Sequence, residues 1–205
     1  MSGFHASISM ILNRFMSNYG SVPVAVASIG AQLESILWNT TEGIKVGIQA
    51  LVGQNYGAGL YERVVEIIKT SFKLVSDIGF VAMSVLFIFR FRLFHLFTPT
   101  DIKAIELGED YLLIFSVLQL LMAVEIGLAG AYNGLSETKT PAAIGEVSMN
   151  LLKIPLVLVL MTFLGVHGVW VAMSTSYNLK GLLSMIFLRK KVRKLKDGTY
   201  KKASL

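Results

Sequence analysis

Cysteine is absent from this 205-residue chain, and charged residues are scarce. Without cysteine there is no disulfide framework and no thiol chemistry. Lys, Arg, Asp and Glu together make up 16% of the residues, whereas soluble globular domains carry about 25%. The chain also lacks a phosphate-binding GxxxxGK loop, an HExxH zinc motif and a GxSxG nucleophile motif. These absences argue against an enzyme, a metal site or a bound cofactor.

Apolar residues are abundant instead: they account for 54% of the chain, and the mean hydropathy is +0.62. They gather in six segments, at about 4–19, 22–53, 61–90, 101–132, 140–163 and 166–190. About 20 mostly apolar residues cross a bilayer as a helix, and in hydrocarbon only a helix satisfies the backbone of a single segment. The sequence therefore predicts an all-α membrane protein, a bundle of six transmembrane helices (1–188) with a basic tail (189–205). The first segment is short and contains Arg14, so it is either an interfacial helix or a piece of a longer protein.

The tail carries eight Lys and Arg residues, in a chain whose net charge is +6. A basic cluster directly after a spanning helix marks the cytoplasmic side, so an even number of spans predicts both termini in the cytoplasm and the chain in the plasma (inner) membrane. Anionic lipid headgroups can also bind such a cluster, whereas nucleic acid is not expected because no separate domain accompanies it. One expected external loop, 90–103, departs from the rule because it contains Arg90 and Arg92. His95 and His167 are also expected in external loops, without a role.

Several local signals predict how the helices begin, bend and pack. Asp101 is expected to cap the helix that follows it, and Pro155 should kink the segment that contains it. Glycines four residues apart, Gly43 with Gly47 and Gly130 with Gly134, predict close packing between membrane helices.

Four motifs in register resemble one family of transporters. GIKVGIQALVGQNYGAG (43–59), GAYNGLSETKTP (130–141), IPL (154–156) and LGVHGVW (164–170) are similar to signatures of the multidrug and toxic compound extrusion (MATE) family. The resemblance implies the second of two six-helix lobes, with the first lobe as a missing partner. It further implies alternating access, drugs or small organic cations as substrates, and H⁺ or Na⁺ as the coupling ion.

Two other functions stay open. A lipid-linked oligosaccharide flippase of the same wider superfamily would line its cavity with basic residues, and here the intramembrane charge is not cationic. A membrane module that assembles with a partner but does not transport is the third interpretation, because the first lobe is absent.

Ionisable residues inside a span are costly and are therefore functional candidates. Glu125 is the first candidate for coupling, because an acid in apolar surroundings can hold a proton near neutral pH; its alternative role is a structural hydrogen bond to a neighbouring helix. In some MATE branches an acid on the tenth helix binds the coupling cation, and the resemblance places that position near Met122. Glu34 and Glu42 are the other coupling candidates, although Glu42 could simply pair with Lys45.

Met122 and the remaining candidates would line a cavity. Gln32 and Asn39 make the second segment the most polar of the long spans. In the fifth segment Glu146, Asn150 and Lys153 are spaced four and three apart, which aligns them on one face of an α-helix. Lys180 is expected to bind a carboxylate within the bundle. Asp77 is expected to pair with Lys73.

Overall fold

The computed structural model describes residue 14 and residues 16–196, and of residues 149 and 150 only the backbone. The elements are α2 (Ser21–Gly57), α3 (Tyr61–Phe97), α4 (Ile102–Gly134), α5 (Lys139–Gly145), the π-helical turn η1 (Glu146–Leu151), α6 (Lys153–Leu164) and α7 (Val166–Lys196). Most of the first predicted segment, 4–19, lies outside the described residues. The expected all-helical class is confirmed.

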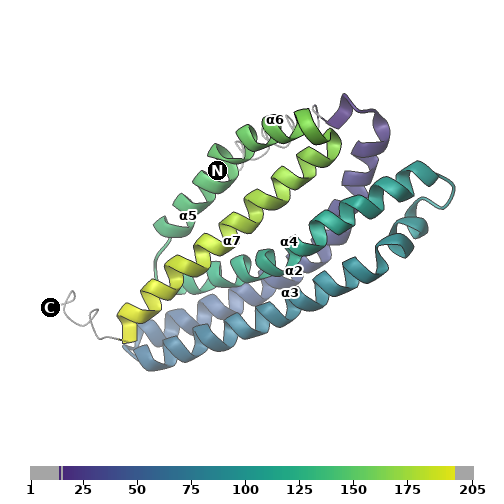
Figure 1. Cartoon of the computed structure of the whole chain (residues 1–205). Coiled ribbons are helices and arrows are strands. Elements are labelled where there is room, and N and C mark those ends of the chain that lie inside the picture. The colour runs from purple at the N-terminus through teal and green to yellow at the C-terminus, as the bar shows by residue number, and fades with distance from the viewer. Residues whose placement is uncertain (1–13, 15, 197–205) are drawn as a thin grey trace.

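Helix α4 is the centre of the bundle. It packs against α2, α3 and α7, and α6 in turn packs on α7 (Figure 1). Within its apolar stretch 67% of the residues are buried, whereas the corresponding stretches of α2 and α3 are each 17% buried. A helix that is apolar on all sides belongs in the interior, and α4 occupies that position.

The outer helices expose large apolar side chains, as expected where lipid is the solvent. Phe80, Ile88 and Phe163 are all more than half exposed. Among the described residues, four helical stretches are long and apolar enough to cross a membrane: α2, α3, α4 and 139–164. Helix α7 is long enough but carries Asn178 and Lys180 in its middle, so the count of six spans stays a prediction.

The predicted loop 90–103 is largely helical, which corrects the expected boundaries. Helix α3 continues to Phe97, because the fully buried ring of Phe94 packs against Gly108 of α4 and anchors the last turns. Arg90 therefore lies on α3 and pairs with Glu109 at 3.1 Å, and Arg92 and His95 also lie on α3.

Of two other expectations about helix starts, one is confirmed and one is wrong. Asp101 does cap α4, since its side chain accepts a hydrogen bond from the Ala104 amide at 3.1 Å. His167 is not in a loop: it lies in the first turn of α7, 3.0 Å from Asp110.

The fifth predicted segment contains a π turn just before its proline. The Leu152 amide donates to the Val147 carbonyl five residues earlier, at 3.1 Å. Pro155 has no amide hydrogen to donate to the carbonyl of residue 151. Irregular turns of this kind are common where the helical ladder loses a donor.

The glycine expectations divide into two groups. A Cβ on Gly130 would meet the Lys45 carbonyl of α2, and one on Gly134 would meet Val52 and the Gln49 carbonyl. These two glycines therefore bring α2 and α4 together, as predicted. Around Gly43 and Gly47 there is open space in the described structure, so the predicted packing role of these two is wrong within this part of the chain.

We expect Gly130→Ala to lower the stability of the chain and Gly47→Ala to leave it unchanged or raise it. Alanine favours both helices by about 1 kcal/mol, but at position 130 the overpacking costs about 1–3 kcal/mol. Thermal unfolding of the detergent-solubilised chain, followed by circular dichroism, checks the pair. Equal unfolding temperatures for the two variants would contradict the packing of α2 on α4.

Candidate functional site

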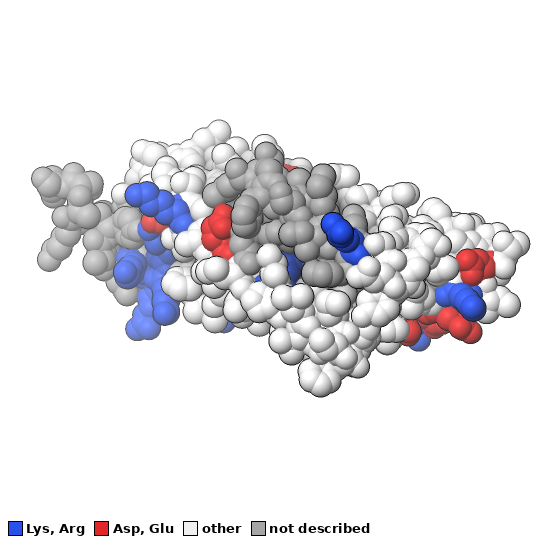
Figure 2. Space-filling model, turned by 90° about the horizontal axis from the view of Figure 1, so that it is seen from above, with Lys and Arg blue, Asp and Glu red and all other residues white. Residues whose placement is uncertain are grey.

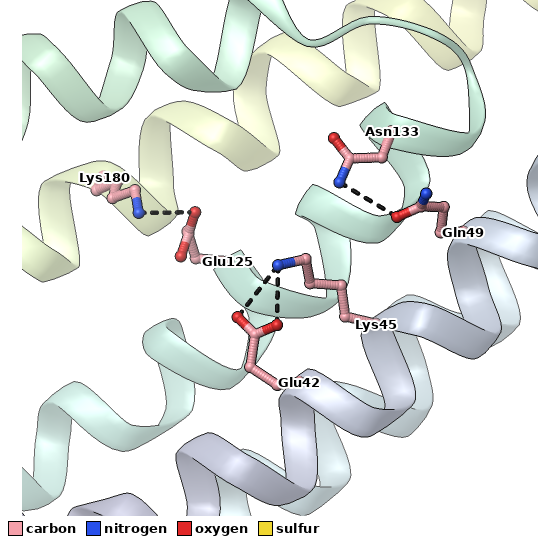
Figure 3. Close-up of polar contacts among 6 residues, drawn as sticks. All are labelled: Glu42, Lys45, Gln49, Glu125, Asn133 and Lys180. Atoms are coloured by element: carbon pink, nitrogen blue, oxygen red, sulfur yellow. Dashed lines mark hydrogen bonds and ion pairs between the residues drawn. The ribbon is translucent and has the colours of Figure 1, made fainter. Parts of the chain in front are cut away.

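An ion pair inside the bundle joins α4 to α7 (Figure 3). Lys180 Nζ lies 3.1 Å from Glu125 Oε1, and the two side chains are 22% and 11% exposed. The expectation that Lys180 binds a carboxylate within the bundle is confirmed. Glu125 does contact a neighbouring helix, but through an ion pair rather than a neutral hydrogen bond.

The local sequence allows this contact because a glycine follows the lysine. A Cβ on Gly181 would meet the Leu121 carbonyl at 2.8 Å, so α7 can approach α4 closely one turn before Glu125. Each charge alone would be expensive in a span. Together they neutralise one another, although desolvation offsets much of the Coulombic gain.

Glu34 makes a second polar contact with α4, on the side toward its beginning. The Tyr111 hydroxyl donates to Glu34 Oε1 at 2.7 Å. Gly30 lies against the Tyr111 ring, where a Cβ would clash, so this glycine lets the ring pass along α2 to reach the carboxylate. The ring also stacks on Phe115, with centroids 4.3 Å apart, and meets Trp170 edge-on at 5.1 Å.

Tyr177 of α7 is near both of these acids. Its phenol is within electrostatic reach of both Glu34 and Glu125, and Lys153 Nζ lies over its ring, 5.3 Å from the centroid. Lys153 is only 6% exposed. The four helices α2, α4, α6 and α7 thus bring two acids and two lysines together around one tyrosine.

Other candidates lie outside this cluster. Glu42 pairs with Lys45 at 2.9 Å (Figure 3), which is the structural alternative given above. Gln32 and Asn39 are exposed on α2. Met122 is 4% exposed in the apolar core, one turn from Glu125.

The fifth segment does not show the predicted alignment of Glu146 and Lys153 on one helix face. Glu146 is exposed whereas Lys153 is buried, because the π turn between them adds a residue per turn and changes the face of the helix. The side chain of Asn150 lies outside the described part. Among the described side chains, no group of three or more His, Cys, Asp or Glu residues could hold a metal ion.

Sequence reasoning did not single out the two tyrosines of the cluster. Spacing gave no signal for Tyr111 or Tyr177, because their acidic neighbours come from other helices. Chemistry could have indicated them, because the hydroxyl of a tyrosine inside a span needs a hydrogen-bond partner.

The family model described as MatE matches residues 2–159. This chain belongs to the MatE family of transporters. The chain is accordingly an integral membrane protein, and its family consists of transporters rather than enzymes.

Curated relatives of this MATE protein are longer than the chain. It is 27% identical over 170 residues to the probable multidrug resistance protein NorM of Thermotoga maritima, covering 82% of the chain and 36% of the relative. It is 23% identical over 202 residues to the protein of that name from Chromobacterium violaceum, covering 92% of the chain and 42% of the relative. The chain thus spans well under half the length of these relatives.

Solved structures agree on the fold. A MATE transporter in the bent conformation superposes with a TM-score of 0.83 at 16% identity, covering 97% of the chain and 44% of that structure. The Vibrio cholerae MATE transporter VcmN in its bent form gives 0.81 at 15% identity, covering 91% and 42%. A multidrug resistance MATE family transporter in its inward-facing conformation gives 0.82 at 16% identity, covering 94% and 45%.

Removing one member of the Glu125–Lys180 pair should destabilise the chain by roughly 3 kcal/mol, because the other charge is left without a partner in a low-dielectric interior. Replacing both with leucine should recover most of that loss. A double-mutant cycle of Glu125→Leu and Lys180→Leu, measured by thermal unfolding in detergent, checks this. Strictly additive effects would show that the two side chains do not interact.

Proposed function

We propose that this chain is the C-terminal six-helix lobe of a cation- or proton-coupled antiporter, which exports drugs or organic cations by alternating access. The observation that carries the proposal is the Glu125–Lys180 pair inside the bundle. A carboxylate held among apolar helices is the group that a coupling ion needs.

Two facts support the assignment to one lobe. The chain covers 36% to 42% of its curated relatives and 42% to 45% of the solved transporters described above. Its four motifs also resemble the signatures of the second half of the family. The missing first lobe would therefore be the partner, and the two lobes would rock around a cavity between them.

The ion pair gives the coupling step a physical basis. The Lys180 ammonium group is paired with the Glu125 carboxylate. Binding of H⁺ or Na⁺ to this carboxylate must therefore compete with the ammonium group. A proton would neutralise the carboxylate and release Lys180, whereas a sodium ion would displace it directly. Glu34, bound by the Tyr111 hydroxyl, is a second carboxylate that could take part.

The interior charge favours the antiporter over the flippase. Among the described side chains of the cluster, Glu34 and Glu125 balance Lys153 and Lys180. A cavity that holds lipid-linked phosphates would need an excess of cations. We further propose the inner membrane as the location, lipid as the surrounding partner and both termini in the cytoplasm, consistent with the basic end of α7.

An efflux assay in cells without their own multidrug pumps tests the proposal. The chain alone, the chain joined to a first lobe from a full-length relative, and the joined protein with Glu125→Gln are compared for export of a fluorescent organic cation. We expect export only from the joined protein, and its reduction to the background of empty-vector cells by Glu125→Gln, since the neutral amide cannot exchange a cation.

Glu42→Gln in the joined protein is the matched control, because it removes the same charge from the outer pair on α2 and should leave export intact. Export that survives Glu125→Gln would assign coupling to the missing lobe. Absence of export from a joined protein that reaches the membrane at normal levels would favour the flippase or the assembly module.

A further inference from the structure

A groove of about 370 Å³ runs between α3 and α7, with α4 as its floor. Its walls are mostly apolar side chains, among them Ile68, Phe72, Leu128 and Met185. Two cations complete the lining, Lys69 of α3 and Arg189 of α7. Neither Glu125 nor any other member of the interior cluster lines this groove.

The two cations lie at the same level of the bundle. Lys69 follows the start of α3 at Tyr61 by eight residues, and Arg189 precedes the end of α7 at Lys196 by seven. At 1.5 Å per residue, both are about 10–12 Å from neighbouring helix ends. The start of α3 and the yellow end of α7 come together at one end of the molecule (Figure 1).

The apolar part of the groove lies deeper in the bundle than the cations. Phe72 and Met185 are each about one helical turn from Lys69 and Arg189, on the side away from those helix ends. Figure 2 shows the largest group of Lys and Arg at one end of this face, mostly uncharged surface beyond it, and a smaller group of mixed charge at the other end. The groove therefore has a cationic mouth toward these helix ends and apolar walls toward the middle of the bundle.

The cations at the mouth are available to a ligand. No carboxylate among the described residues lies within ion-pair distance of Lys69 or Arg189, although Lys191 nearby is paired with Glu137 at 2.9 Å. Both side chains are exposed. Arginine can hold two phosphate oxygens with its planar fork, and lysine adds a point charge.

We propose that this groove binds an anionic phospholipid, with its phosphate between Lys69 and Arg189 and one acyl chain along Phe72, Leu128 and Met185. Basic pockets between membrane helices bind anionic headgroups in this way. Apolar walls would contribute nothing to a free phosphate ion, so the bilayer lipid is the occupant that uses the whole groove. This inference does not depend on the proposed transport activity.

Native mass spectrometry of the full chain in detergent tests the site. The chain is titrated with dioleoylphosphatidylglycerol and, separately, with dioleoylphosphatidylcholine, which has the same acyl chains without net charge. We expect the first phosphatidylglycerol to bind more tightly than phosphatidylcholine. Removing each basic residue should weaken that binding about fivefold, so Lys69→Gln with Arg189→Gln should abolish most of the preference.

Lys190→Gln with Lys194→Gln is the matched control. It removes the same charge from the same end of α7 at residues that do not line the groove, and it should keep the preference. A charge-preserving exchange, Lys69→Arg with Arg189→Lys, should also keep it, and this variant separates recognition from misfolding.

Three results would overturn the proposal. Equal binding of the two lipids would show that headgroup charge is not recognised. Equal losses in the groove variant and the control would assign the effect to the basic cluster as a whole. Displacement of phosphatidylglycerol by inorganic phosphate at similar concentration would show a free-anion site.

Discussion

The burial of most of α4 at the centre of the bundle is the constraint on which the rest of this structure depends. A central helix in a membrane bundle can be apolar all round, but α4 carries Glu125 at a buried position. That carboxylate needs a partner from a neighbouring helix, and Lys180 of α7 provides it at 3.1 Å. The position of α7 against α4, made possible by the close approach at Gly181, follows from this requirement together with packing.

The structure separates two kinds of polar contact. The cluster of Glu34, Tyr111, Tyr177 and the Glu125–Lys180 pair is interior and joins different helices, so a change there alters how helices meet. The Glu42–Lys45 pair lies within a single helix and is partly exposed, and pairs of that kind contribute little. A functional argument therefore concerns the first group, and the cationic groove between α3 and α7 is a separate surface.

Much of the fold could be predicted from hydrophobic runs, because length and composition determine a membrane helix. Local chemistry predicted three contacts: the cap at Asp101, the pairing of Lys180 with a carboxylate, and the packing of Gly130. The contact of Glu34 with Tyr111 was not, because it joins residues 77 positions apart. The alignment of Glu146 with Lys153 on one face was also mispredicted, since the π turn between them cannot be read from spacing alone. Gly43 and Gly47 show that a small-residue pattern does not say which neighbour is present.

The attachment of the α6–α7 hairpin has a mechanical consequence. In the described part of the chain, α6 packs mainly on α7, and α7 carries the main contact back to α4. The tight turn at Gly165, with its positive φ of 58°, couples the two helices of the hairpin. Because Lys180 lies on α7 and Glu125 on α4, a movement of the hairpin away from α4 would lengthen the distance between these two charges. The position of the hairpin and the state of the Glu125–Lys180 ion pair would then depend on one another.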